Sequence, residues 1–354
     1  NLLFWVVDMS TLRVALVFLI LGAWPVQGLM PININAELEQ QPPDHSNCAF
    51  GKVIPEFYVL GAKNTATTSL SNDLRERGVW AAPRNKAKEW QFFLRSDSLP
   101  DDEELLASWL AQLPECRKKR RVLADFSVTN LFANQLPADF EWSPQVGYAG
   151  RRHRAPDMWA TAQRINHFHR TAGPATVPPK FVVMLRDPLA RTQSEYYHTL
   201  PLQNCRGCMA KDNFVDSFAL NVELLRHKQM SDWFWKSFYA RQIEPFEREF
   251  NASQFMFVPN KEYYAFDPLG FSSELLSWLE LADAQPWEEA SKANTHAKPA
   301  LDAELPPEHP ARVIYQALME PECQRLVQLM SRMHKQGATL AGYTGPSGDE
   351  VAVR

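Results

Sequence analysis

Two segments of this chain, residues 57–70 and 180–196, share a pattern in which an apolar strand runs into a polar turn and then a helix. In the first, the apolar run Phe57–Leu60 stops at Gly61, and Leu70 and Leu74 follow at helical spacing. In the second, Phe181–Leu185 is a candidate buried strand. The repeated pattern predicts an α/β domain with a central, mostly parallel sheet flanked by helices.

The first turn collects hydroxyl side chains where a helix begins. Four of them, Thr65, Thr67, Thr68 and Ser69, stand near its first turn. The first N–H groups of a helix lack intrahelical partners and the helix dipole favours an anion there, so a phosphate would suit this position. The alternative is that these hydroxyls only cap an ordinary helix. The turn lacks the Gly-Lys-Ser/Thr ending of ATP and GTP loops, which argues against a P-loop kinase or NTPase.

The second turn supplies a cation for a phosphate. Arg186 follows the carboxyl end of a predicted strand, the edge where ligands bind in open α/β sheets, and its planar fork matches a phosphate dianion. Pro188 suits a first helical turn, and Ser194 lies two turns further on as a hydroxyl donor. The alternative is that Arg186 and Asp187 form a salt bridge that closes the turn.

These residues resemble two motifs of the sulfotransferase family. The family's 3′-phosphate motif, R-D-P-x-x-R-x-x-S-x-Y, is matched in full by residues 186–196. Its 5′-phosphosulfate loop, G-x-x-K-x-G-T-T-x-L, is matched by Gly61, Thr67, Thr68 and Leu70. The likeness runs from about residue 55 to about residue 332, and it implies the P-loop-like sulfotransferase fold. It also implies 3′-phosphoadenosine 5′-phosphosulfate (PAPS) as sulfuryl donor and co-substrate.

Further stretches resemble the Golgi-type branch that sulfates carbohydrates such as heparan sulfate. Lys88-Glu89-Trp-Gln-Phe-Phe93 is similar to its K-E-x-x-F-F element, which implies that Glu89 is the general base. The alternative is a surface carboxylate paired with Lys88 or Lys86. Residues 125–129 resemble the branch's E-K-S-P strand end, and residues 292–296 resemble its loop over the nucleotide, with Lys292 or His296 closing over the donor.

The resemblance assigns the site residue by residue. Glu89 and Lys63 are the expected catalytic residues, and Arg186 with Ser194 the expected ligands of the 3′-phosphate. The remaining expected donor-binding residues are Gly61, Lys63, Asn64, Thr65, Ala66, Thr67, Thr68, Ser69 and Lys292.

Three positions depart from the family's pattern. Asn64 stands where the loop lysine is expected, one place after Lys63. Either Lys63 reaches the donor or activity is impaired, which leaves a nucleotide- or glycan-binding protein as the alternative function. Ala66 replaces a glycine, which suits only a residue that does not need a positive φ. Phe126 replaces the lysine of E-K-S-P.

The amino-terminal part predicts entry into the secretory pathway. Arg13 precedes the apolar run 14–24, which has the length of a signal-peptide core and is too short for a spanning helix. We expect a cleaved signal or, second, a short type II anchor in residues 1–28, with a Golgi-lumenal or secreted enzyme. Residues 29–51 are expected to be a stem, 52–340 the sulfotransferase domain and 341–354 a disordered tail. Asn251-Ala-Ser253 is a glycosylation sequon.

Cysteines, charge and histidines limit the partners. Five cysteines leave one unpaired, and Cys205–Cys208 or a pairing among Cys48, Cys116 and Cys323 both stay open. The net charge of -4 gives no general attraction to polyanions, so we expect no nucleic-acid partner. Residues 117–121 and 151–154 are basic clusters that could attract an anionic glycan or could be solvated faces. No histidine or cysteine spacing implies a metal. The acceptor is expected to be a carbohydrate, with glycosaminoglycan, other polysaccharide, glycolipid and protein tyrosine all open.

Overall fold

The structure is a computed structural model. It describes residues 47–81, 89–95, 103–116, 122–132, 136, 139–143, 160–173, 176–200, 212–260, 268–281, 284–293 and 298–341. The chain divides into two compact units, Asn1–Glu39 and Gln40–Arg354, and all described residues belong to the second. Among the described residues, none of the helices combines the length and the apolar character that crossing a membrane requires.

A parallel sheet forms the centre of the second unit, with strand order β4-β3-β6-β8-β9. Its strands are β3 (Phe57–Gly61), β4 (Ala124–Asp125), β6 (Lys180–Leu185), β8 (Phe255–Pro259) and β9 (Thr339–Leu340). Short pairs lie outside it: β1 (Cys48–Ala49) with β2 (Lys52–Val53), antiparallel, and β5 (Glu141–Trp142) with β7 (Gln229–Met230), parallel. The helices cover the sheet on both faces, so the predicted α/β class is confirmed.

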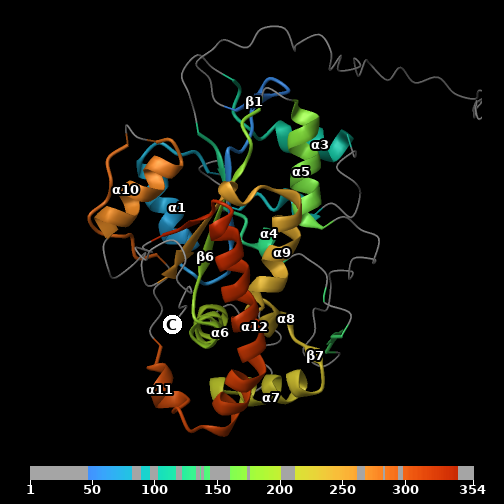
Figure 1. Ribbon diagram of the computed structural model, residues 1–354, viewed down its shortest axis with the longest axis vertical. Helices are drawn as coiled ribbons and strands as arrows, with labels where there is room; N and C mark the ends of the chain where they lie inside the picture. Colours follow the sequence, from blue (N-terminus) through green and yellow to red (C-terminus); the bar gives the residue numbers. More distant parts are fainter. Residues whose placement is uncertain are drawn as a thin grey trace, which may run out of the picture. The chain divides into compact units, whose positions relative to one another are not determined.

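The helices follow the strands in the order that the sequence pattern predicts (Figure 1). The first half of the chain contains α1 (Thr67–Glu76), α2 (Phe92–Arg95), α3 (Glu103–Leu110), α4 (Thr129–Phe132) and α5 (Thr161–Ala172). The second half contains α6 (Pro188–Thr199), α7 (Phe214–Arg226), α8 (Asp232–Trp235), α9 (Tyr239–Glu249), the 3-10 turn η2 (Ala252–Gln254), α10 (Pro268–Trp278), α11 (Leu301–Glu304) and α12 (Pro310–Lys335).

Alternation along the central strands sends side chains to opposite faces of the sheet. Tyr58 and Leu60 of β3 pack into one cluster with residues of α5, α9 and α12, and Phe57 and Val59 pack into another with residues of α1 and α10. Because both faces are covered, the strands are apolar at nearly every position. Figure 1 shows α1 and α10 on one side of β6 and α5 and α9 on the other.

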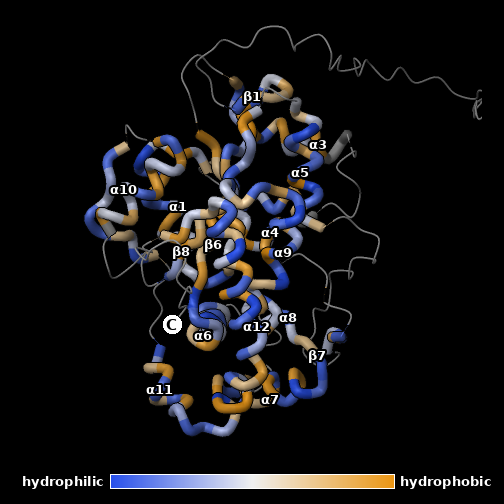
Figure 2. The backbone as a smooth tube through the Cα atoms, in the orientation of Figure 1, coloured by the Kyte–Doolittle hydropathy of each residue, from blue (hydrophilic) through white to orange (hydrophobic). Residues whose placement is uncertain are grey.

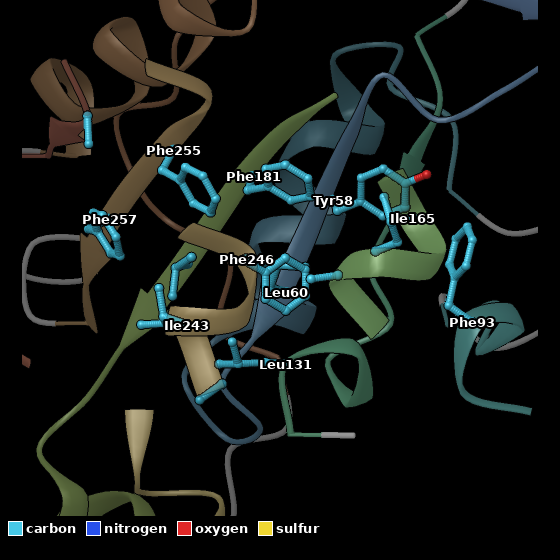
Figure 3. Packing of buried hydrophobic residues seen from close by; sticks show 14 of the residues in the cluster. Tyr58, Leu60, Phe93, Leu131, Ile165, Phe181, Ile243, Phe246, Phe255 and Phe257 are labelled. Atoms are coloured by element: carbon cyan, nitrogen blue, oxygen red, sulfur yellow. The ribbon is translucent and has the colours of Figure 1, made fainter. Parts of the chain in front are cut away.

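An aromatic row crosses the first of these faces. Tyr58, Phe181 and Phe255 are paired in register on β3, β6 and β8, and their rings stack at centroid distances of 5.7 and 5.0 Å. Figure 3 shows these rings side by side, with Phe246 of α9 nearby. Large buried rings contribute strongly to the hydrophobic stabilisation, so this row fixes the register of the strands that carry the site.

A third cluster lies below the sheet around α6, α7, α8 and α12. Phe214, Phe218 and Val222 share one face of α7 and are buried, which Figure 2 shows as hydrophobic colour on that segment. Trp233 and Trp235 of α8 are fully buried here as well. Both tryptophans therefore belong to the core.

A disulfide ties the start of the described chain to the rest of the unit. Cys48 of β1 pairs with Cys116, with a Cα–Cα distance of 6.1 Å, and Cys323 is free. Asn47 is buried as well. The disulfide and the β1–β2 pairing therefore hold residues 47–51, which belong to the expected stem, against the domain.

Candidate active site

The candidate site lies where the chain leaves the sheet in opposite directions. From β3 the chain passes through α1 to β4 on one side, and from β6 it passes through α6 to α9 to reach β8 on the other. The carboxyl ends of β3 and β6 are adjacent because the two strands pair in parallel. Such a switch point opens a crevice at the carboxyl edge, which is where open α/β sheets bind ligands. Both turns predicted to bind phosphate follow these two ends.

The turn between β3 and α1 has a tightly constrained backbone. Gly61 has φ +135°, and a Cβ atom there would lie 3.0 Å from the carbonyl oxygen of Val128, so the position needs glycine. Asn64 and Ala66 also have positive φ, 67° and 77°. Thr65 is buried, and its hydroxyl donates to the carbonyl oxygen of Ala62 at 2.5 Å. The Thr65 hydroxyl therefore shapes the turn from inside.

Ala66 is the N-cap of α1 and is left-handed. Its methyl side chain cannot accept a hydrogen bond from the helix, unlike a Ser or Asp cap. Alanine in place of the family's glycine suits only a residue without a positive φ, but the structure gives Ala66 a positive φ. Thr67 and Ser69 are buried in the first turn and Thr68 is half-buried.

A second segment is anchored on α1. The Ser69 hydroxyl accepts a hydrogen bond from the N–H of Ala293 at 3.1 Å, and the Asp73 carboxylate accepts bonds from the N–H and hydroxyl of Ser291. Lys292 lies between these anchors, so its backbone is held beside α1, and its role over the donor stays a prediction. Its exposed ammonium is 3.3 Å from Glu289. His296 and Lys88 lie outside the described residues.

Arg186 joins the two turns. Its guanidinium donates to the carbonyl oxygen of Asn64 at 3.1 Å, and its own carbonyl oxygen accepts from the Tyr239 hydroxyl at 3.0 Å. Asp187 is the N-cap of α6 and accepts from the N–H of Ala190 at 2.7 Å. Arg186 is half-buried and faces the loop that it was predicted to complement.

Some of the remaining residues of the second motif are buried in the fold, and others lie near the candidate site. Arg191 is fully buried, and its guanidinium bonds to Glu195, Ser237 and the carbonyl oxygen of Trp233. Tyr196 is buried in the cluster around α7. Ser194 is half-buried on α6, on the helix that begins beside Arg186. Thus the motif's second arginine and its tyrosine hold the fold, and Arg186 and Ser194 remain as candidate ligands.

Lys63 reaches α6 through an ion pair that the sequence analysis missed. Its ammonium lies 3.0 Å from a carboxylate oxygen of Glu195, which is fully buried. Glu195 also pairs with Lys236 at 2.7 Å and with Arg191 at 2.6 Å. Burial by itself raises the pKa of Glu195. The positive charges of Lys236, Lys63 and Arg191 together have the larger effect and hold this pKa well below its ordinary value. Glu195 therefore stays ionised and holds Lys63 by a charged bond.

Glu89 lies at the carboxyl end of β4, beside β3. The Gln91 side-chain amide donates to its carboxylate at 3.2 Å, and the Gln91 N–H donates to the Ser127 hydroxyl at 2.7 Å. The Ser127 hydroxyl donates in turn to the buried Asp125 at 2.5 Å. Burial raises the pKa of Asp125, the bonds from Ser127 and Asn130 lower it, and the negative charge of Glu89 raises it again, with a net rise. Glu89 is half-buried near Asp125.

Phe126 explains one departure from the family's pattern. Its ring is fully buried and packs edge-on against Phe57 at a centroid distance of 6.3 Å. The Phe126 side chain therefore belongs to the core and adds no charge to the site.

Lys298 is a cation near the site that the sequence analysis did not single out. Partial burial and the positive charge of Arg186 lower the pKa of its ammonium. A signal was available, since Lys298 follows the predicted loop 292–296 by two residues. For Glu195 and Lys236 the sequence held no such signal, because their role depends on how α6 packs on α8.

Other predicted features lie elsewhere. The basic clusters 117–121 and 151–154 and the pair Cys205–Cys208 fall outside the described residues. Among the described residues, no group of three or more His, Cys, Asp or Glu side chains is placed to hold a metal ion. A groove of about 430 Å³ lies at the amino end of β6, lined by His169, Pro179 and Phe250 among others, and so at the edge of the sheet opposite the candidate site.

No protein-family model and no curated protein sequence matches the chain. Among solved structures it is similar to the crystal structure of a sulfotransferase from Alicyclobacillus acidocaldarius. The identity is 21%, the match covers 78% of this chain and 96% of that chain, and the TM-score is 0.48.

Proposed function

We propose that this protein is a PAPS-dependent sulfotransferase of the EC 2.8.2 type. The observation that carries the proposal is the bond from the Arg186 guanidinium to the Asn64 carbonyl oxygen at 3.1 Å. It brings Arg186, the first residue of the R-D-P-x-x-R-x-x-S-x-Y motif, against the turn 61–69 at the switch point of the sheet. A ligand with a phosphate at each end, such as PAPS, fits such a pair of turns.

The side chains at this edge suit an anionic donor. Lys63 and Arg186 supply positive charge, and α1 begins at Thr67 with its dipole directed at the same turn. In the proposed complex, the turn 61–69 binds the 5′-phosphosulfate and Arg186 with Ser194 binds the 3′-phosphate. Lys63 stabilises charge on the oxygen that bridges sulfur and phosphorus, and Lys292 covers the donor.

The transfer follows the logic of phosphoryl transfer, in which alignment and electrostatic stabilisation matter most. The acceptor oxygen or nitrogen attacks sulfur while the bond from sulfur to the bridging oxygen breaks. The acceptor's proton passes to Glu89, and 3′-phosphoadenosine 5′-phosphate leaves with the electron pair of the broken bond. Glu89 is favoured as the base because it lies at the carboxyl edge of the sheet near Asp125.

The proposed acceptor is a hydroxyl or amine of a carbohydrate, encountered in the Golgi lumen or after secretion. A disulfide between Cys48 and Cys116 supports an oxidising compartment. Asn251 and Ser253 are exposed, which suits glycosylation of the sequon. The acceptor assignment rests on the resemblance of residues 88–93 to the carbohydrate-modifying branch.

A direct assay tests the proposal on the full chain expressed through a secretory system. Labelled PAPS is supplied with a panel of glycans, glycolipids and tyrosine peptides, and transfer is measured. Glu89→Gln is expected to lower kcat by about 10²–10⁴-fold, the range for loss of a general base. Arg186→Ala is expected to raise the KM for PAPS by at least about tenfold, because a charged phosphate contact is lost.

Two exposed positions provide matched controls. Glu76 is on the surface of α1 and Arg248 on the surface of α9, so Glu76→Gln and Arg248→Ala are expected to leave transfer unchanged. If Glu89→Gln and Arg186→Ala also left transfer unchanged, the site assignment would be wrong.

A second candidate function is nucleotide or glycan binding without efficient transfer. The observation that favours it is the engagement of Lys63 by the buried Glu195, together with Asn64 at the position of the family's lysine. Asn64→Lys separates the two candidates. A large gain in turnover with Asn64→Lys would identify an impaired site. If Lys63 instead stabilises the bridging oxygen, Asn64→Lys is expected to leave turnover unchanged and Lys63→Ala to abolish transfer.

A further inference from the structure

The groove at the amino end of β6 has no part in the proposed transfer, because it lies at the edge of the sheet opposite the candidate active site. Its walls come from three places: the end of α5, the residues 176–179 that lead into β6, and residues 249–251 with Gln254. Its volume of about 430 Å³ falls within the range of small-molecule sites, about 300–1,000 Å³. The groove is therefore large enough to hold one sugar ring.

The surface of the groove combines apolar and polar side chains. Val177 is 45% exposed, Pro178 is exposed and Phe250 is half-buried. The Asn166 side-chain amide donates to the Glu249 carboxylate at 2.7 Å, so these two polar groups are fixed beside each other. A sugar ring has apolar C–H faces and a rim of polar groups, and a concave surface of this composition complements both.

The wall before β6 is held in place by hydrogen bonds. The Asn47 side-chain oxygen accepts from the Val177 N–H at 3.0 Å, and the Asn47 amide donates to the Val177 carbonyl oxygen at 3.4 Å. The Thr176 hydroxyl donates to the Gly173 carbonyl oxygen at 2.8 Å. A wall that is already ordered loses little conformational entropy when a ligand packs on it.

The glycosylation sequon opens onto this groove. Asn251 is one of the lining residues, and both Asn251 and Ser253 are exposed while Ala252 between them is buried. The Asn251 N–H donates to the Gln254 side-chain oxygen at 2.9 Å, and the Gln254 amide donates to the Pro179 carbonyl oxygen at 2.6 Å. One side chain thus fixes the backbone of the sequon to the groove wall. A sugar joined to Asn251 starts at the groove.

We propose that Asn251 carries an N-linked glycan whose first N-acetylglucosamine packs in the groove against Val177, Pro178 and Phe250. The Asn251 amide nitrogen forms a bond to the anomeric carbon of a lipid-diphosphate-linked oligosaccharide and loses one proton. The bond from that carbon to the diphosphate breaks, and the lipid diphosphate leaves with the electron pair. The inference rests on the secretory location within the proposed function and does not depend on sulfuryl transfer.

Peptide mapping by mass spectrometry tests the modification on the full chain expressed through a eukaryotic secretory system. The peptide that contains Asn251 is expected to carry hexose and N-acetylhexosamine. Treatment with peptide N-glycosidase is expected to release the glycan and to convert Asn251 to aspartate. Ser253→Ala destroys the sequon but keeps Asn251, so it is expected to abolish the modification. An unmodified Asn251 in the wild-type protein would overturn the proposal.

Thermal unfolding of two forms with the same sequence tests the packing. Endoglycosidase trimming leaves one N-acetylglucosamine on Asn251, and protein made while synthesis of the lipid-linked oligosaccharide is inhibited carries none. The single sugar is expected to raise the midpoint of unfolding by about 2 °C, because it covers apolar surface of the folded state. Val177→Ser is expected to remove this difference. Val313→Ser is the matched control, since Val313 of α12 is 49% exposed and lies outside the groove, and it is expected to leave the difference unchanged.

The outcomes separate this inference from the proposed function. Equal midpoints of the two forms, or a difference that survives Val177→Ser, would refute the packing in the groove. The protein without a glycan is expected to transfer sulfate as fast as the trimmed protein, because the groove and the candidate active site lie at opposite edges of the sheet. Transfer together with an unmodified Asn251 would refute only this inference. A glycan packed as described, without transfer to any acceptor, would refute only the proposed function.

Discussion

Glu195 is a single buried carboxylate that faces three cationic side chains, from the turn after β3, from α6 and from the end of α8. Burying any charge costs free energy, and here the cost is offset only because every charge is paired. The arrangement connects the candidate site to the core, since the residue that holds Lys63 also holds Arg191. Loss of the Glu195 carboxylate is therefore expected both to lower the free energy of unfolding and to release Lys63.

Glu195→Gln is therefore expected to lower the free energy of unfolding by about 3–5 kcal/mol, because it leaves buried cations without their partner. Urea denaturation measures the change. Glu223→Gln is the control, since Glu223 is an exposed residue of α7 that pairs with Arg226 and His227 on the surface, and no measurable change is expected there. Equal effects of the two substitutions would contradict the role given to Glu195.

His169 makes stability depend on pH. Burial lowers the pKa of its imidazole from 6.5 to about 3, and the ring bonds to the Tyr58 hydroxyl at 2.9 Å. Between these two values the unfolded chain binds a proton that the folded chain does not, so this stabilisation is present above pH 6.5 and is lost as the pH falls toward 3.

From pH 7 to pH 5 the free energy of unfolding is expected to fall by about 2 kcal/mol through His169 alone. His169→Gln is expected to remove that part of the pH dependence, measured by urea denaturation across the range. Tyr58→Phe serves as the control because it deletes the bond and keeps the buried imidazole, so the pH dependence remains. An unchanged slope in His169→Gln would show that other groups cause it.

At the scale of elements, α1 begins under backbone strain. Ala66 has φ 77° as its N-cap, a conformation that costs a residue with a Cβ atom about 1–2 kcal/mol. Glycine avoids this cost but loses more conformational entropy on folding. The left-handed Ala66 thus lowers the stability of the fold while it fixes the backbone geometry of the proposed phosphosulfate turn.

Ala66→Gly is accordingly expected to raise the free energy of unfolding by about 0.5–1 kcal/mol. Thermal or urea denaturation measures it. Ala317→Gly makes the same chemical change at an exposed position inside α12 and is expected to destabilise by about 1 kcal/mol. If both substitutions destabilised the protein, the left-handed assignment at residue 66 would be contradicted.

At the scale of the whole molecule, one covalent link closes a long loop. The Cys48–Cys116 disulfide joins residues 68 apart in sequence and holds β1 against the rest of the second unit. A cross-link of this length restricts the unfolded chain and stabilises a fold by about 2–4 kcal/mol.

The double variant Cys48→Ser/Cys116→Ser is expected to lose about that much of its free energy of unfolding, measured by urea denaturation without reductant. Cys323→Ser is the control, since Cys323 is free. After this double substitution, a reductant is expected to have little further effect. A large additional loss on reduction would point to another stabilising disulfide.

Local sequence patterns determined the elements and the chemistry of the candidate site. Apolar runs ending at Gly61 and before Arg186 predicted β3 and β6, and hydroxyl and guanidinium side chains predicted an anion site after each. These features depend on residues close together in the chain, which is why they could be predicted. The tertiary structure decided the rest, because it depends on contacts between distant segments: the pairing of β3 with β6, the bond from Arg186 to Asn64, and the ion pair between Lys63 and Glu195.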